Sequence, residues 1–364
     1  MTAVGSALER IDPRRHWDGA VIDCDVHAAV PSLDTLYPYM DTVWEHMARD
    51  RGWFGPYGAA ATYPPNAPST SRPEWRAENR APASGLDLLQ KDVLDPMRVE
   101  RAVVNCYYGI DTLRHPDWAA AIARAVNDWI IADWLDKDSR LVASISLPAR
   151  DPAAMVAEIE RVGDHPGFVQ AFLPIRSDRL YGQRVYHPVF EALTRHDLVL
   201  GLHWGGTTED APSVTGFPSW YVERYAAEWQ AYAAQIASLL AEGVFKAYPT
   251  LRVAVFEGGF TWIPQWGWRL NKEWKGLRRE VPWLDRRPLD LIREHMRFSI
   301  SPIDSGPADA LVRIVDWLGS EDILMYGSDY PHWHDDDLSD LLPHVSETMR
   351  SNIMSETARA WYRL

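Results

Sequence analysis

The sequence predicts an α/β fold, a (β/α)₈ barrel that carries additional segments over one face. Eight short apolar runs recur along the 364 residues, amphipathic segments separate them, and side chains with catalytic potential follow several of the runs. Nearly continuous apolar runs are typical of parallel strands that are buried on both faces. Eight such strands with helical connections fit a closed barrel. Because 46% of the residues are hydrophobic and 24% are charged, a large core can form.

The order of the elements supports this fold. Helical patterns, with apolar side chains three and four residues apart, cover Asp117–Leu135, Pro152–Val162 and Pro188–Thr194. An open doubly wound sheet is the competing architecture, but no glycine-rich phosphate loop follows the first run. The expected strands are Val21–His27, Ala102–Tyr107, Leu141–Leu147, Gly167–Pro174, Leu198–His203, Leu251–Glu257, Met296–Ile300 and Ile323–Ser328.

Two longer segments interrupt the alternation of strands and helices. Residues 31–97 include the proline-rich stretch Tyr63–Pro68. Residues 205–242 begin with the polar loop Gly205–Ser219 and continue as a long helix to about Glu242. Both segments leave the carboxyl ends of expected strands, where barrel enzymes place lids and specificity loops. We therefore expect one domain over residues 1–364, with both insertions above the barrel mouth.

Composition limits the partners of this chain. A net charge of −14 argues against nucleic acid or an anionic membrane as the main partner, but it says little about the substrate. There is no apolar signal segment and no run of 18 apolar residues, and Cys24 and Cys106 are too few for a disulfide framework. These features favour a cytoplasmic protein. Among the 18 tryptophans, those in Trp262–Trp283 are expected to pack in the core or to form a homodimer contact.

Four of the expected strands end in side chains that bind metal ions. Asp25 and His27 lie two residues apart at the end of the first strand, so both point to the same side. His203 ends the fifth strand, Glu257 ends the sixth and Asp329 follows the eighth. In a barrel these ends meet at one face, and buried carboxylates and imidazoles are costly without a partner. A shared cation is the simplest explanation.

These motifs resemble the amidohydrolase superfamily, in the branch that includes aminocarboxymuconate semialdehyde decarboxylase and the dihydroxybenzoate-type decarboxylases. Ile22–His27 is similar to the metal motif of strand one, Gly201–Gly206 to the histidine motif of strand five, and Gly327–His332 to the aspartate motif of strand eight. The resemblance covers essentially the whole chain. It implies a Lewis-acidic Zn²⁺ or Mn²⁺ and a metal-activated water that Asp329 orients or deprotonates. The metal ligands that it implies are Asp25, His27, His203 and Asp329.

The sixth strand departs from the decarboxylase pattern, because Glu257 stands where those enzymes carry a catalytic histidine. Glu257 could replace that histidine as a general acid/base, hold a ligand histidine in place, or bridge a second metal. With His332 three residues beyond Asp329, and with Asp23 nearby, the site has enough carboxylates and imidazoles for two ions. Two iron ions would suit such a ligand set, and a dinuclear hydrolase with a bridging hydroxide is equally consistent with it.

Further side chains are candidates for the same site. His332 is either a metal ligand or substrate contact, or the cap of the next segment, whereas His334 is expected at a solvated helix start together with residues 335–337. Arg176 could clamp a substrate carboxylate, although a surface ion pair is the favoured interpretation. Tyr107 and Trp204 are candidates for substrate contact.

Two enzymatic functions therefore stay open. The first is a metal-dependent lyase or hydrolase that acts on a carboxylated or carbonyl-bearing small molecule, as the resemblance implies. The alternative is a dinuclear non-haem iron monooxygenase that hydroxylates a bulky apolar substrate, with Glu257 and His332 completing the second metal site. A binding protein that has lost its chemistry is the least favoured interpretation, because the ligand residues are intact.

Overall fold

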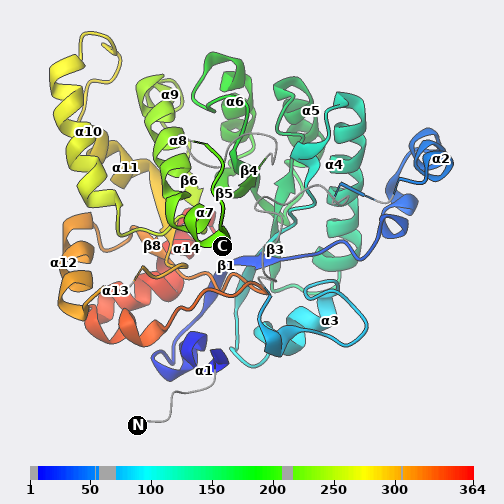
Figure 1. The fold of residues 1–364 in the computed structure, drawn as a ribbon, viewed down its shortest axis with the longest axis horizontal. Coiled ribbons are helices and arrows are strands. Elements are labelled where there is room, and N and C mark those ends of the chain that lie inside the picture. The colour runs from blue at the N-terminus through cyan, green and yellow to red at the C-terminus, as the bar shows by residue number, and fades with distance from the viewer. Residues whose placement is uncertain (1–6, 54, 57–70, 207–215, 305) are drawn as a thin grey trace.

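The computed structural model describes residues 7–53, 55–56, 71–206, 216–304 and 306–364. In these ranges eight strands form one parallel sheet in the order β1 to β8 (Figure 1). Cys24 N donates to Tyr326 O at 3.0 Å and His27 N donates to Tyr330 O at 2.8 Å, which joins β1 to the segment after β8. The predicted (β/α)₈ barrel is confirmed. The strands are β1 (Ile22–His27), β2 (Arg101–Asn105), β3 (Leu141–Ser146), β4 (Phe168–Arg176), β5 (Val199–Gly206), β6 (Val253–Val255), β7 (Met296–Ser299) and β8 (Leu324–Met325).

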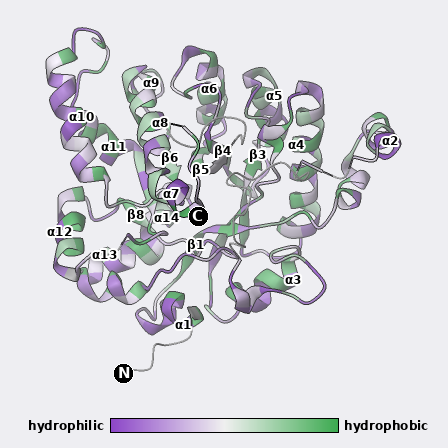
Figure 2. Ribbon diagram, in the orientation of Figure 1, coloured by the Kyte–Doolittle hydropathy of each residue, from purple (hydrophilic) through white to green (hydrophobic). Residues whose placement is uncertain are grey.

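Helices surround the strands on the outside of the barrel (Figure 1). Hydrophilic and hydrophobic residues alternate along them (Figure 2), because each helix buries only one side. The predicted helix Pro152–Val162 is found with the same bounds, whereas the long helix expected up to Glu242 is interrupted at Glu228. The helices are α1 (Ala7–Ile11), α2 (Thr42–Arg51), α3 (Leu86–Leu89), α4 (Pro116–Ile130), α5 (Pro152–Val162), α6 (His187–Arg195), α7 (Tyr221–Ala227), α8 (Trp229–Ala241), α9 (Val244–Ala247), α10 (Ile263–Leu277), α11 (Pro288–His295), α12 (Ala308–Leu318), α13 (Glu347–Ser351) and α14 (Thr357–Tyr362).

The last helix closes one end of the barrel interior. Trp361 and Tyr362 of α14 are buried in a cluster with Ile22 and Cys24 of β1 and Val103 of β2. These strand residues point into the barrel, so the helix fills the space that the strands leave at this end. Both predicted free thiols, Cys24 among them, are buried.

Strands six and eight are shorter than predicted, and a residue with left-handed backbone follows each of them. Glu257 has a backbone φ of +55° and Asp329 a φ of +54°, so the chain leaves the extended conformation at or before each residue. Left-handed backbone is uncommon for residues other than glycine and is costly to hold. Because this geometry carries no signature in the apolar pattern, the sequence predicted longer strands.

The predicted insertions are described only in part. The stretch Tyr63–Pro68 and residues 207–215 of the loop Gly205–Ser219 lie outside the described residues, and one domain with two insertions as lids stays a prediction. No helix in the described ranges is long and apolar enough to cross a membrane. In the tryptophan-rich segment, Trp262, Trp266 and Trp274 pack against the core, whereas the Trp268 side chain is exposed.

Candidate metal centre

The structure brings the predicted side chains together at one rim of the barrel. Asp25 and His27 come from β1, His203 from β5 and Glu257 from the residue that leaves β6, and their candidate ligand atoms all lie within 4.8 Å of one another. A second set with the same spread contains His27, Glu257, Asp329 and His332, so the two sets share His27 and Glu257. Asp329 therefore belongs to the second set rather than the first.

Imidazole and carboxylate groups alternate around this centre. His27 Nε2 lies 3.0 Å from Asp329 Oδ1 and 3.5 Å from Asp25 Oδ1. His203 Nε2 lies 3.3 Å from Asp25 Oδ1, and His203 Nδ1 lies 2.8 Å from the carbonyl oxygen of Trp204. A proton on Nδ1 that is donated to this carbonyl leaves Nε2 free to donate its lone pair to a metal ion, which is the usual orientation of a ligand histidine.

Two carboxylate oxygens at the centre lack the hydrogen bonds that buried oxygens normally make. Asp25 Oδ2 and Glu257 Oε1 are buried and accept no hydrogen bond from any described residue. Yet Glu257 Oε1 lies 3.4 Å from His332 Nδ1, 3.7 Å from His27 Nε2 and 3.8 Å from His203 Nε2. Oxygen and nitrogen atoms that converge without bonding to one another fit a common cation.

Burial and charge shift the pKa values of these groups in opposite directions. Burial and the charge of Asp329 raise the pKa of Glu257, whereas contacts with His332 and His27 outweigh burial and hold the pKa of Asp329 well below its usual range. Burial opposes the imidazolium of His203, but Glu257 and Asp25 raise its pKa to about 10. Without a cation, protons on histidine therefore balance the carboxylates, and a divalent ion would replace them.

His332 and His334 both contact Asp329. His332 Nδ1 lies 3.0 Å from Asp329 Oδ1, and His334 Nε2 lies 2.6 Å from Asp329 Oδ2. Burial opposes protonation of His334, but the hydrogen bond to Asp329 raises its pKa to about 9. The prediction that His334 is solvated was wrong, because the turn after Pro331 directs it back to the centre. Of the acidic stretch behind it, Asp335 is exposed, as expected. The expectation was wrong for Asp336, which is buried and accepts hydrogen bonds from Ser301 Oγ and Ile303 N at 2.8 Å each.

Asp23 lies behind the centre rather than in it. Its Oδ1 accepts hydrogen bonds from Asp25 N at 3.1 Å and from Ser328 N at 2.9 Å. Burial raises the pKa of Asp23 to about 7. Because these bonds tie the end of β1 to the end of β8, Asp23 fixes the backbone that carries Asp25 and Asp329.

The three candidates for substrate contact lie over the ends of β2, β4 and β5. Arg176 Nε lies 3.3 Å from Glu228 Oε1, and the two side chains are only 11% and 5% exposed, so the expectation of a surface ion pair was wrong. The Tyr107 hydroxyl donates to Asp111 Oδ1 at 2.8 Å and accepts from Gly206 N at 2.9 Å. Trp204 faces α7, where the Arg224 guanidinium lies 4.5 Å from its ring centre.

Helix α7 supplies residues that the sequence reasoning missed. The Tyr225 ring lies 6.0 Å from that of Trp204, 4.9 Å from that of Tyr221 and 6.2 Å from that of His334, measured between ring centres. Helix α7 therefore reaches from the Trp204 side of the mouth to the metal centre. Only the position of this helix after the strand-five loop pointed to such a role.

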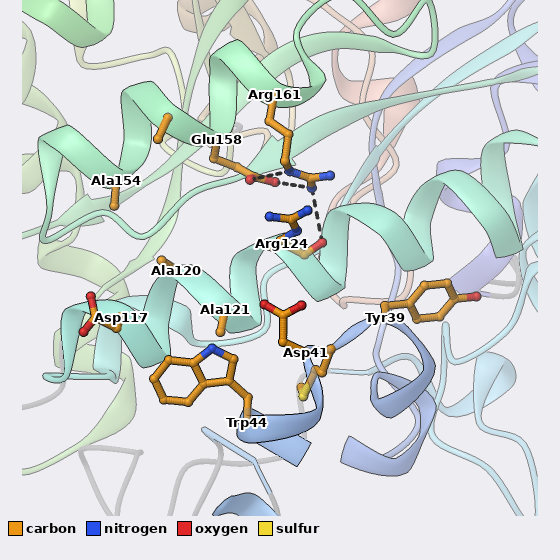
Figure 3. A pocket seen from close by; sticks show the side chains of 12 residues that line it. Tyr39, Asp41, Trp44, Asp117, Ala120, Ala121, Arg124, Ala154, Glu158 and Arg161 are labelled. Carbon is orange, nitrogen blue, oxygen red and sulfur yellow. Dashed lines mark hydrogen bonds and ion pairs between the residues drawn. The ribbon is translucent and has the colours of Figure 1, made fainter. Parts of the chain in front are cut away.

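A separate pocket lies outside the barrel, between α2, α4 and α5 (Figure 3). It has a volume of about 340 Å³, and Trp44 stands at one side of it, across from Arg161. Arg161 is held by Glu158, with Nη2 and Oε1 2.7 Å apart. The pocket shares no residue with either ligand set, so it is distinct from the candidate metal centre.

A barrel with candidate ligand side chains at the ends of β1, β5 and β6 and after β8 is typical of a class of metal-dependent enzymes. Residues 22–364 match the family model described as amidohydrolase, and the chain belongs to this family. The resemblance to the amidohydrolase superfamily is thus confirmed. Enzymes of this family use metal ions, and this chain is an enzyme of the same class.

Sequence relatives of this chain include gamma-resorcylate decarboxylases. The chain is 27% identical over 258 residues to a gamma-resorcylate decarboxylase of Rhizobium radiobacter, covering 68% of this chain and 77% of the relative. An amidohydrolase of Mycobacterium avium subsp. paratuberculosis has a TM-score of 0.70 and 19% identity, over 95% of this chain and 98% of the other. A dihydroxybenzoic acid decarboxylase of a Polaromonas species, solved with manganese and 2-nitroresorcinol, has a TM-score of 0.67 and 18% identity, with the same coverage.

The comparisons favour one of the two predicted functions. The expectation of a metal-dependent enzyme of lyase type is confirmed, and manganese is bound in a solved relative. Neither the family nor these relatives support the dinuclear iron monooxygenase.

Proposed function

We propose that this chain is a decarboxylase that acts on carboxylated phenols with one Mn²⁺ held by Asp25, His27, His203 and Glu257. The observation that carries the proposal is the first ligand set, whose four atoms lie within 4.8 Å of one another and include a glutamate oxygen without a hydrogen bond. Manganese accepts carboxylate and imidazole ligands. The substrate class follows from the names of the relatives, which act on resorcylate and dihydroxybenzoate.

The bound cation supplies Lewis acidity that neutralises the oxygens of the substrate and lowers the cost of building negative charge on its ring. Decarboxylation breaks the bond between ring carbon and carboxylate, releases CO₂, and leaves an electron pair on the carbon, which must then accept a proton. His332 is placed to hold this proton, because its Nδ1 lies 3.0 Å from Asp329 Oδ1 and 3.4 Å from Glu257 Oε1. Asp329 and Glu257 are its acid/base partners.

Asp329 is also placed to orient the histidines. Its Oδ1 contacts His27 and His332 at 3.0 Å each, and its Oδ2 contacts His334 at 2.6 Å. We assign it the alignment of His27 towards the cation and the stabilisation of the protonated form of His332, while water from the solvent resupplies the proton that each turnover consumes. Glu257 would then act mainly as a ligand, which explains why a carboxylate can stand where the relatives' branch carries a histidine.

The mouth above the centre suits a flat anionic ring. Trp204, Tyr221 and Tyr225 supply aromatic faces, and Arg176 and Arg224 bring two buried cations that share the carboxylate of Glu228. We propose that Arg176 binds a carboxylate or phenolate oxygen of the substrate, with Trp204 packing on the ring and Tyr107 lining the pocket.

Metal content and product release test the proposal together. We expect one Mn²⁺ per purified chain, and CO₂ from 2,6-dihydroxybenzoate or a related carboxylated phenol under strict exclusion of oxygen. His332→Asn should retain the Mn²⁺ and lose at least 100-fold in kcat, whereas His203→Asn should lose the metal. No bound metal, or no CO₂ from any carboxylated phenol, would contradict the proposal. Two cations per chain would reassign Asp329 and His332 as ligands of a second ion, and cleavage of an ester or amide without CO₂ would indicate a hydrolase.

A cytoplasmic location and a homodimer through the tryptophan-rich segment remain predictions from the sequence. The exposed Trp268 ring lies 5.4 Å from that of Trp317, between ring centres, which gives this face an apolar surface that a second copy of the chain could cover.

A further inference from the structure

A row of polar side chains crosses the interior of the barrel, where such folds normally pack branched apolar residues. Asn105 of β2, Ser144 of β3 and Gln170 of β4 are buried, with exposed fractions of 0%, 1% and 0%. Tyr362 of α14, at the closed end of the barrel, is 4% exposed. None of these four residues belongs to either ligand set of the metal centre.

These side chains form one continuous series of hydrogen bonds that ends on a proposed metal ligand. The Tyr362 hydroxyl donates to Gln170 Oε1 at 2.9 Å, and Gln170 Nε2 donates to Ser144 Oγ at 2.8 Å. Ser144 Oγ donates to Asn105 Oδ1 at 2.6 Å, and Asn105 Nδ2 donates to Asp25 Oδ1 at 2.7 Å. We call this series the interior chain.

Every donor in the interior chain points towards Asp25. Because Asn105 Oδ1 accepts from Ser144, the amide group of Asn105 must face Asp25 with its nitrogen, and Gln170 is oriented in the same way by the hydroxyl of Tyr362. Bonds arranged in one direction polarise one another, so a distant donor strengthens the last bond. Gly201 of β5 makes room for this arrangement, since a Cβ atom there would lie 2.7 Å from Gln170 Cδ and Nε2.

Stability alone does not explain a polar chain in this place. Well-packed apolar residues are usually at least as stabilising as a buried polar network of the same volume. The interior chain instead binds Asp25 Oδ1, the carboxylate oxygen that also lies 3.3 Å from His203 Nε2 and 3.5 Å from His27 Nε2. The last bond of the interior chain thereby holds the Asp25 carboxylate so that this oxygen faces the two proposed ligand histidines.

We infer that Tyr362, Gln170, Ser144 and Asn105 are positioning residues, which orient Asp25 through one series of hydrogen bonds and so set the affinity of the centre for a divalent cation. This inference rests on the proposed role of Asp25 as a ligand. It assigns a function to Tyr362, which lies at the opposite end of the barrel from the substrate mouth.

The test compares Mn²⁺ affinity between two tyrosine variants. Tyr362→Phe removes the first donor of the chain, and Tyr181→Phe is its matched control, because the buried Tyr181 hydroxyl donates to Pro174 O at 2.8 Å outside the chain. Titration with Mn²⁺, followed by electron paramagnetic resonance of the free ion, gives Kd for each protein. We expect a Kd two- to fivefold higher for Tyr362→Phe, 10- to 100-fold higher for Asn105→Ala, and unchanged for Tyr181→Phe.

Failure of this inference is distinct from failure of the proposed function. If the parent binds Mn²⁺ and both tyrosine variants bind it equally well, the inference is overturned while the metal site stands. If the parent binds no Mn²⁺, the proposed function fails. The inference can then still be tested in metal-free protein by a double-mutant cycle of Tyr362→Phe and Asp25→Asn, with the Tm as the measured quantity. There we expect Tyr362→Phe to lower the Tm less in an Asp25→Asn background than in the parent. Equal Tm shifts in the two backgrounds would overturn the coupling.

Discussion

Two carboxylates in the same centre should respond to neutralisation in opposite directions when no metal is bound. Asp329 accepts contacts from three imidazole nitrogens at 3.0, 3.0 and 2.6 Å, so the fold stabilises its charge. Glu257 Oε1 is buried and accepts no hydrogen bond from any described residue, and burial raises the pKa of this group, so the fold disfavours its charge. We predict that Glu257→Gln stabilises the metal-free protein and that Asp329→Asn destabilises it.

The size of each effect follows from the same contacts. Burying the Glu257 charge without a hydrogen bond costs about 1–3 kcal/mol, and Glu257→Gln removes this charge, whereas breaking a buried ion pair costs about 3–5 kcal/mol, which Asp329→Asn introduces. An unfolding entropy of about 2.1 cal/mol/K per residue over 364 residues makes 1 kcal/mol equivalent to about 1.3 °C in Tm. The expected shifts are therefore about +1 to +4 °C for Glu257→Gln and about −4 to −7 °C for Asp329→Asn.

Calorimetry in the presence of a chelator measures both shifts, and addition of Mn²⁺ provides the second half of the test. Glu257→Gln should bind Mn²⁺ at least about 100-fold more weakly than the parent, a loss of about 2.8 kcal/mol, because it removes a proposed ligand. A variant that is both less stable without metal and unchanged in Mn²⁺ affinity would refute the reasoning. It would show that Glu257 serves the fold and not the cation.

Three further predictions concern the scaffold. Gly206→Ala should lower the Tm, measured by calorimetry, by about 4 °C or more. Gly206 has a φ of +118°, and a Cβ atom there would clash with the backbone oxygen of Arg176. An unchanged Tm would contradict this prediction. Hydrogen bonds from Arg140 lower the pKa of Asp138 to about 2, so their stabilisation is complete above about pH 4 and is lost as the pH falls towards 2. Asp138→Asn should therefore cost at most about 1 kcal/mol at pH 7, and its Tm difference from the parent should shrink between pH 5 and pH 3; a constant difference would exclude the ion pair as its cause. Light scattering should show a dimer for the parent and a monomer for Trp268→Glu, and a monomeric parent would refute the predicted homodimer.

The barrel could be predicted from the sequence because its signal is repeated. Eight apolar runs with helical connections leave few arrangements, and the type of residue at the end of each run indicated which face carries the chemistry. Asp25, His27 and His203 were identified in this way because each lies within or at the end of a regular strand, where a spacing of two residues fixes the direction of the side chain.

The side chains that depend on irregular backbone could not be predicted. His334 follows a turn, and no periodicity indicates that it folds back onto Asp329 at 2.6 Å. The buried pair of Arg176 and Glu228 joins residues 52 positions apart in sequence, across a loop whose path the residue pattern does not encode. The interior chain escaped notice because Asn105, Ser144 and Gln170 each interrupt an otherwise apolar run, where single polar residues carry no clear meaning.

The left-handed backbone at Glu257 and Asp329 has a consequence for how this protein would evolve. By backbone conformation alone, glycine would be the more stable choice at both positions, by about 1 kcal/mol each. A laboratory selection that rewarded heat resistance and ignored turnover should therefore discard the carboxylate at Glu257 early, while Asp329 would persist through its contacts with histidine. Both residues should endure only where the reaction itself is under selection.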